Sequence, residues 1–299
     1  MSSVSFVKIH DSTERSIKEG ISKSLDLIGY SFSKKNATIV IKPNLCYYWD
    51  YTTGQTTDPR FVAALIDLIR EKISPSADIS IVESDASAMK CKYAFRILGY
   101  EQLSKDRGVR LVNLTEDPCE FVQIRACGQS FRFMMPRAVR QADLKINTPK
   151  IKYTVEKLGI TCALKNIFGC NPFQKKSLYH RRIDETIVAL NKAMGFNLCI
   201  VDGTVVSGVQ PRWLGLLMAS TDPVAVDAVA ARIAGLNPVR IRYLNLASRE
   251  GLGTLNFASH GERLEYFIER YPCKSLKNKL RKRTNDLLAF TGMNKKIGL

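Results

Sequence analysis

Residues 143–170 read DLKINTPKIKYTVEKLGITCALKNIFGC, and they give the strongest indication of the fold. Its first residues alternate between apolar and polar side chains, as in a short strand that ends at Asn147-Thr148-Pro149. Lysines, threonines and glycines follow, so the strand leads into a cationic loop rich in hydrogen-bonding groups. Open α/β sheets bind ligands in loops that follow strands. The stretch therefore predicts an α/β sheet with its working site at this loop.

The rest of the chain alternates strands with helices. Apolar or alternating runs typical of strands occupy residues 4–9, 37–41, 78–82, 109–113, 197–201 and 214–219. Helical patterns lie between most of these runs, and residues 61–73 are the clearest example. Residues 121–125 and 130–134 indicate a hairpin. This order predicts a mostly parallel, doubly covered (Rossmann-like) α/β sheet with a small hairpin insertion and a basic C-terminal helix.

The chain is long enough to bury a large core. It has 299 residues, of which 45% are hydrophobic and 24% are charged, as in ordinary globular proteins. No apolar run reaches the roughly 18–20 residues of a transmembrane helix, and the N-terminus shows no signal-peptide pattern. We therefore expect a cytoplasmic protein, with peripheral attachment to a membrane as the alternative. We expect residues 1–260 to form the α/β domain and residues 261–299 to form a basic helical appendage.

The net charge of +17 is divided between the body of the chain and its tail. Residues 271–299 hold eight Lys or Arg and one acid, which gives +7, and the other 270 residues carry +10. A basic body suits an anionic ligand, whereas a basic tail suits a nucleic acid or an anionic membrane surface. Residues 275–290 predict a helix with a stripe of leucines among the basic residues. Such a helix docks on its own protein or on a partner, or lies on a membrane.

The eight cysteines show no CxxC pair and no ferredoxin-like spacing, so we expect reduced thiols. Cys162 and Cys170 flank Lys165, and they are the candidate ligands for iron or zinc. The cofactor is left open on this basis: the alternatives are none, a divalent metal or an iron–sulfur cluster. Free thiols are favoured, because two thiols eight residues apart lack a second pair.

Polar side chains follow the predicted strands at several places. They are Lys42 and Asn44, Asp85, Asn147 and Lys150, and Asp202. Because the carboxyl ends of parallel strands lie along one edge of a sheet, we expect these side chains to converge. Lys165 lies in the apolar context CALKNIFG, so partial burial is expected to lower its pKa and to call for an anionic partner.

These residues define a predicted site for an anionic substrate. We assign Lys165 and Asn166 to polarise or attack the reacting group, and Asp85 or Asp202 to accept a proton or bind a metal. The predicted substrate-binding residues are Lys42, Asn44, Thr57, Asp58, Asn147, Lys150, Lys152, Thr161 and His180.

Several of these features also have a purely structural interpretation. The Lys42-Pro43-Asn44 sequence is a common kind of turn, and residues 57–59 and 221–223 (both Thr-Asp-Pro) are strong helix starts. His180 lies in a run of basic residues typical of a solvated face. Asp227 lies in an apolar helix, so it must face solvent or find a partner, for which a site lysine is one candidate.

The sequence lacks the GxGxxG, Walker, GxSxG and HExxH motifs. Their absence argues against common nucleotide-dependent dehydrogenases, P-loop kinases, α/β-hydrolases and zincins.

The order of the motifs resembles the family known as domain of unknown function 362. Members share a lysine-proline-asparagine turn, a threonine-aspartate-proline helix start, an AD-x-x-IN-x-PK-x-K strand, a T-x-ALKN-x-FG loop and a DPVA-x-DA helix. Here these occupy residues 42–44, 57–59, 142–152, 161–169 and 222–228, within a similarity that covers about residues 35–255. The resemblance implies the α/β fold and a site at the lysine-rich loop.

The resemblance also carries expectations about cofactors. The family is described as iron–sulfur-related because some members carry a ferredoxin-like module, which this chain lacks. Many relatives have histidine where this chain has Thr154. The pattern of a strand followed by a lysine loop is also similar to the N-terminal domain of nickel-pincer lactate racemases, in which a loop lysine anchors the cofactor.

The leading hypothesis is an enzyme that acts on a small metabolite carrying phosphate or carboxylate, by lysine-assisted group transfer or redox chemistry. The second hypothesis is a non-catalytic scaffold that holds a metal or an iron–sulfur cluster. The third is a protein that binds nucleic acid or an anionic membrane through its tail.

Overall fold

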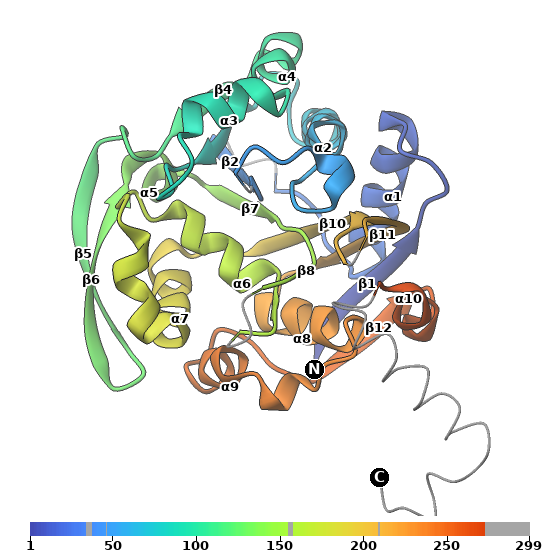
Figure 1. The fold of residues 1–299 in the computed structure, drawn as a ribbon. Coiled ribbons are helices and arrows are strands. Elements are labelled where there is room, and N and C mark those ends of the chain that lie inside the picture. Colours follow the sequence, from blue (N-terminus) through green and yellow to red (C-terminus); the bar gives the residue numbers. More distant parts are fainter. Residues whose placement is uncertain (34–37, 46, 155–157, 209, 273–299) are drawn as a thin grey trace, which may run out of the picture.

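A computed structural model describes residues 1–33, 38–45, 47–154, 158–208 and 210–272, and Figure 1 shows its arrangement. The described residues form an eight-stranded sheet in the order β12-β1-β11-β10-β7-β2-β3-β4. Its strands are β1 (Ser2–Lys8), β2 (Thr38–Pro43), β3 (Asp78–Glu83), β4 (Arg110–Asn113), β7 (Leu144–Thr148), β10 (Leu198–Val206), β11 (Arg212–Ser220) and β12 (Phe257–Gly261). Neighbouring strands are parallel except at β11, which is antiparallel to both β1 and β10.

Helices cover both faces of this sheet, which confirms the predicted fold class (Figure 1). One face carries α1 (Glu14–Leu27), α2 (Pro59–Lys72), α3 (Cys91–Ile97) and α4 (Tyr100–Arg107). The other carries α5 (Arg137–Gln141), α6 (Ala163–Asn166), α7 (Ile183–Met194), α8 (Pro223–Ile233), α9 (Arg242–Arg249) and α10 (Leu264–Arg270). In β2, Ile39 and Ile41 pack with α1 and α2 while Val40 packs on the opposite side. This alternation explains why both faces of the strands are apolar.

The predicted hairpin is formed by β5 (Cys119–Ala126) and β6 (Gln129–Pro136), which pair antiparallel and pack against α7. Cys127 and Gly128 connect them with φ angles of 52° and 71°. A two-residue turn with two positive φ angles matches the twist of a hairpin, and glycine adopts the second at little cost. A second, small pair consists of β8 (Lys152–Tyr153) and β9 (Ile160–Thr161).

Both Thr-Asp-Pro sequences begin helices, as predicted. Asp58 accepts a hydrogen bond from the backbone N–H of Arg60 (2.9 Å) at the start of α2, and Asp222 accepts one from Ala225 (2.9 Å) at the start of α8. After α8, β12 pairs with β1, and Phe267 of α10 packs on Phe6. The predicted tail helix at residues 275–290 lies outside the described residues. Within the described part, no helix has the length and apolar character needed to cross a membrane.

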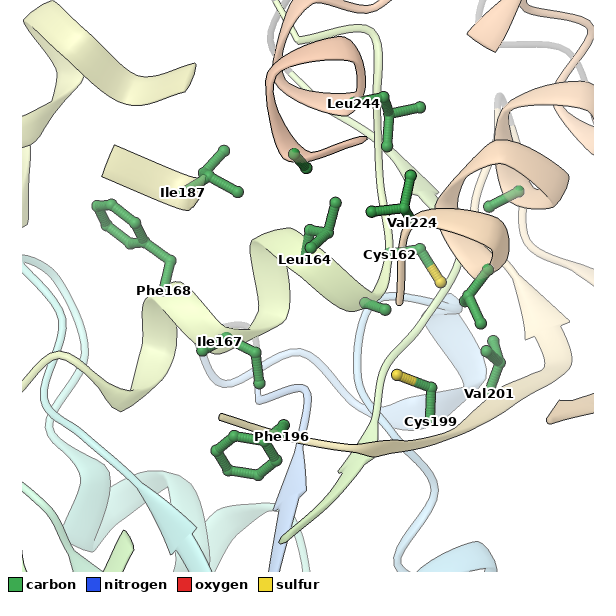
Figure 2. Packing of buried hydrophobic residues seen from close by; sticks show 14 of the residues in the cluster. Cys162, Leu164, Ile167, Phe168, Ile187, Phe196, Cys199, Val201, Val224 and Leu244 are labelled. Carbon is green, nitrogen blue, oxygen red and sulfur yellow. The ribbon is translucent and has the colours of Figure 1, made fainter. Parts of the chain in front are cut away.

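The short helix α6 and the 3-10 segment η2 (Ile167–Cys170) are embedded in the core (Figure 2). The side chain of Leu164 faces Val224 of α8 and Leu244 of α9, and that of Phe168 faces Ile187 of α7 (Figure 2). A four-residue helix has little stability of its own. Its position therefore depends on the packing of these apolar side chains.

We expect Leu164→Ala to lower the free energy of unfolding by about 2–5 kcal/mol, because it leaves a cavity beneath α6. Chemical denaturation measures this loss. The control is Leu178→Ala, which removes the same atoms from a side chain that is 66% exposed and should change stability by less than about 0.5 kcal/mol. Equal effects of the two substitutions would contradict the structural role given to α6.

Candidate active site

A cavity of about 670 Å³ lies at the carboxyl ends of β2, β3 and β7, beside α6. Its walls include six basic side chains: Lys42, Lys150, Lys152, Lys165, Lys176 and His180. Among the described residues that line it, Glu83 is the one carboxylate. The cavity is therefore strongly cationic.

The first buried ion pair joins neighbouring strands. Lys42 at the end of β2 places Nζ 2.7 Å from Glu83 Oε2 at the end of β3, and also donates to the carbonyl oxygen of Pro43 (2.6 Å). Both side chains are nearly inaccessible to solvent. A β-carbon at Gly169 would lie 2.9 Å from Lys42 Nζ and 2.8 Å from Glu83 Oε1, so a larger residue there would have to displace the ends of the paired side chains.

The second buried ion pair joins the loop after β7 to β10. Lys150 Nζ lies 3.0 Å from Asp202 Oδ2, and the two residues also form an isolated parallel bridge. Thr204 donates to Oδ1 through its backbone N–H (3.1 Å) and its hydroxyl (2.6 Å), and Asp58 N–H donates to Oδ2 (3.0 Å). Lys150 Nζ has this ion pair but no hydrogen bond among the described residues. Its ammonium therefore keeps hydrogen-bonding capacity at the cavity wall.

A chain of three side-chain amides links the predicted residues. Lys152 Nζ donates to Asn44 Oδ1 (2.5 Å), Asn44 Nδ2 donates to Asn166 Oδ1 (2.7 Å), and Asn166 Nδ2 donates to Asn147 Oδ1 (2.7 Å). Asn147 Nδ2 then donates to the carbonyl oxygen of Ala163 (2.9 Å). Each amide is oriented by its neighbours, so the chain fixes Lys152 and α6 relative to the ends of β2 and β7.

Lys165 is half-buried on the cavity wall, with Nζ 4.1 Å from the centre of the Phe168 ring. His180 lies at the exposed edge of the cavity, where burial and Lys165 lower its pKa. Thr161 lines the same cavity and its hydroxyl contacts the carbonyl oxygen of Lys152 (3.4 Å). These three predicted residues therefore face one space.

Three other predicted residues lie beside the cavity rather than in its lining. Thr57 supports the strand ends, because its hydroxyl donates to Thr148 O (2.8 Å) and accepts from Asn44 N (2.9 Å). Asp58 caps α2 and pairs with Arg60 (2.7 Å). Asp85 pairs with Lys90 (2.8 Å) and accepts from Cys91 N (2.9 Å).

Asp227 holds the start of α6. Its Oδ1 accepts from the backbone N–H groups of Ala163 (2.5 Å) and Leu164 (3.4 Å), and its Oδ2 accepts from Tyr243 Oη (3.1 Å). The prediction that a site lysine pairs with this carboxylate is wrong. The N-cap residue of α6 makes no side-chain hydrogen bond, and the backbone N–H groups at the start of α6 donate to Asp227 instead. Complete burial raises the pKa of Asp227 to about 7.

The two candidate metal ligands are buried thiols. Burial raises the pKa of Cys170 to about 12 and that of Cys162 well above its usual range, so both are protonated at neutral pH. Cys162 packs in the core near α6 (Figure 2). Among the residues that the structure places, no group of three or more His, Cys, Asp or Glu is arranged to hold a metal.

Sequence patterns did not identify Ser84 and Lys176 as a pair. Lys176 Nζ donates to Ser84 Oγ (2.6 Å), and both residues line the cavity although they are buried. Burial lowers the pKa of Lys176 to about 8, an effect that Glu83 opposes and Lys42 reinforces. Lys176 lies in the basic run KKSLYHRR, which looks like a solvated surface in the sequence. Only the tertiary structure distinguishes it from its neighbours.

Three comparisons relate the chain to known proteins. The family model "Domain of unknown function (DUF362)" matches residues 39–232. The "Thylakoid-associated protein sll1697" of Synechocystis sp. is 30% identical over 240 residues, which is 75% of this chain and 70% of the relative. Among solved structures, the lactate racemase apoprotein from Thermoanaerobacterium thermosaccharolyticum aligns with a TM-score of 0.47 and 11% identity. That alignment covers 79% of this chain and 58% of the racemase chain.

The pKa of Asp227 generates a test of its role. Because the folded-state pKa is raised from 3.8 to about 7, the folded protein holds this proton more tightly than the unfolded chain. The associated stability is present below about pH 4 and is lost as the pH rises through about 7. Asp227→Asn keeps an acceptor for the Ala163 N–H but cannot ionise. The stability of the wild type relative to this variant should therefore fall across that interval.

Chemical denaturation at several pH values measures this difference. The control is Asp26→Asn, which removes one carboxylate from an exposed position. If the stability curves of the wild type and Asp227→Asn run parallel throughout, the raised pKa is contradicted.

Proposed function

The chain belongs to the family described as domain of unknown function (DUF362), and we propose that it is an enzyme that acts on a small anionic metabolite. The observation that carries this proposal is the charge of the cavity, where five lysines and one carboxylate line about 670 Å³. Asp202, which pairs with Lys150, adds a second carboxylate, and the lysines still outnumber the carboxylates. A ligand with phosphate or carboxylate groups supplies the missing negative charge.

The geometry suggests how the anion is held. Lys150 comes from the loop after β7, Lys152 begins β8, Lys42 lies near the end of β2, and Lys165 comes from α6. Ion pairing and the amide chain fix the first three before any ligand arrives. Fixed cationic donors bind an anion with a small entropic cost.

A catalytic role is supported by the protonation behaviour of the cavity. Lys176 has its pKa lowered to about 8, so it exchanges protons near physiological pH. We assign Lys165 to polarise the reacting group from the cavity wall. Asn166 is assigned a positioning role instead, because its side chain is already bonded to Asn44 and Asn147 and so orients Lys152 through the amide chain.

We expect Lys165→Met to weaken binding of inorganic pyrophosphate by about tenfold to a hundredfold, because one charge-assisted contact contributes roughly 1.5–3 kcal/mol. The melting temperature should change little, since Lys165 is only half-buried. Isothermal titration calorimetry at low and high salt measures the affinity. The control is Lys105→Met, which removes an exposed lysine of α4 outside the cavity. Unaltered affinity in Lys165→Met would remove Lys165 from the site, and absence of binding by phosphate, pyrophosphate and citrate to the wild type would defeat the proposal.

We also propose that the tail attaches the protein to an anionic membrane surface. Residues 271–299 carry a net charge of +7 with leucines spaced along a predicted helix, and a relative is named as thylakoid-associated. Basic segments bind anionic lipids with about 1 kcal/mol per Lys or Arg, and salt screens the attraction.

The chain should co-sediment with phosphatidylglycerol vesicles at low salt, and much less at high salt or with phosphatidylcholine vesicles. A variant that ends at residue 272 serves as the matched comparison and should stay in the supernatant. Equal sedimentation of both proteins would overturn the proposal. Preferential binding of the tail to RNA over vesicles would assign it to a nucleic acid instead.

A further inference from the structure

A serine and a lysine from distant parts of the chain meet inside the cavity. Ser84 directly follows β3, and Lys176 begins the 3-10 segment η3 (Lys176–Arg182). Lys176 Nζ and Ser84 Oγ are 2.6 Å apart, within the distance that allows a proton to pass between a base and a nucleophile. Both line the cavity next to Lys42 and Glu83.

The serine is held in a defined orientation. Its hydroxyl makes a very short contact with the carbonyl oxygen of Gly169 and a second contact with that of Asn171 (3.0 Å), and its backbone N–H donates to Glu83 Oε1 (3.0 Å). A hydroxyl has one proton and two lone pairs, so it donates either to one carbonyl or to a neutral amine at residue 176. The two carbonyls therefore fix the side chain without preventing the proton from moving to Lys176.

The burial of Lys176 is not explained by charge neutralisation. Glu83 forms its ion pair with Lys42 (2.7 Å), so Lys176 is placed beside a carboxylate that already has a cation. If Ser84 were only structural, a carbonyl oxygen would satisfy its hydroxyl without Lys176. Burying an ammonium beside that hydroxyl costs free energy. Because Lys176 is easily deprotonated, its position suits the role of a general base better than that of a structural hydrogen-bond donor.

We propose that Ser84 is a nucleophile and that Lys176 is its general base, in acyl transfer from an anionic ester or thioester bound in the cationic cavity. The proposal rests on the proposed function, which supplies the binding of the anion. It adds the reaction type and two residues that touch the reacting atoms.

The step balances without a further reactant. Neutral Lys176 takes the proton of Ser84 Oγ while Oγ bonds to the carbonyl carbon, and the carbonyl electron pair moves to oxygen. The resulting oxyanion forms beside the cationic side chains of the cavity, which stabilise it. Its collapse breaks the bond to the leaving alcohol or thiol, which receives the proton from Lys176. Water then attacks the acyl-serine by the same route and regenerates the hydroxyl.

The test uses the full chain and two electrophilic probes, a fluorophosphonate and 4-nitrophenyl acetate. Peptide mass spectrometry should locate an adduct on Ser84, and Ser84→Ala should abolish it. Lys176→Met should slow labelling at least about a hundredfold, which is the lower end for a general base. In the wild type the labelling rate should rise with pH through about 8, because the amine acts when it is neutral. This pH dependence should be lost in Lys176→Met.

The matched control is Ser87→Ala. Ser87 also lines the cavity, but its hydroxyl donates to the carbonyl oxygen of Gln174 (3.4 Å), so labelling should be unchanged. Thermal melting of each variant shows whether it folds. The proposal is overturned if neither probe modifies Ser84, if folded Ser84→Ala is labelled as fast as the wild type, or if Lys176→Met keeps the rate and its pH dependence.

Pyrophosphate binding separates this proposal from the broader one. Ser84→Ala removes no charged side chain from the cavity, although Lys176 loses its hydrogen-bond acceptor, so the variant should still bind pyrophosphate. Pyrophosphate binding without Ser84 labelling would refute the serine–lysine pair alone, whereas labelling without anion binding would refute the anionic substrate.

Discussion

The carboxyl edge of this sheet depends on the pairing of two buried lysines. Lys42 and Lys150 are 1% and 2% exposed, and an ammonium removed from water to that extent needs an anion beside it. Glu83 and Asp202 fill these positions at 2.7 Å and 3.0 Å. Removing one partner of such a pair typically costs about 3–5 kcal/mol, because the other charge remains buried. The two pairs therefore join β2 to β3 and the loop after β7 to β10.

The site and the core are stabilised by the same segment. On one side, α6 is packed by Leu164 and η2 by Phe168, against helices from later in the chain (Figure 2). On the other side, Asn166 and Lys165 reach the amide chain and the cavity. Asp227 adds a carboxylate at the N-terminus of α6, where free backbone N–H groups need acceptors. A helix this short holds its functional side chains in place only because all three sets of contacts act together.

Much of the fold and part of the site could be predicted from sequence. Apolar runs and Thr-Asp-Pro starts indicated the strands and helices, because burial on both faces and capping leave local patterns. The antiparallel direction of β11 has no such signal, since its apolar run fits either direction. Lys42, Lys150 and Lys152 were recognisable because they follow strands.

Some residues and contacts of the site could not be identified from local sequence patterns. Glu83 and Ser84 were passed over for Asp85, because a shift of one or two residues at a strand end decides which side chain faces the cavity. Asp227 was singled out in its apolar helix, but its partner was not, because the backbone N–H groups that it accepts from lie more than sixty residues earlier in the chain. Lys176 is chemically identical to the lysine before it, and only burial beside Ser84 separates them.

The excess positive charge that favours an anion also affects the base. Lys42 is among the causes that lower the pKa of Lys176, so a cationic environment promotes the neutral amine as well as ligand binding. A bound anion placed directly against Lys176 would reverse this effect and keep the amine protonated. The arrangement therefore works best when the charged part of a substrate lies near Lys150 and Lys152, and its carbonyl carbon lies near Ser84. In the proposed reaction, binding and proton transfer would use different lysines of one cavity, and the charge that attracts the substrate would also keep the base active.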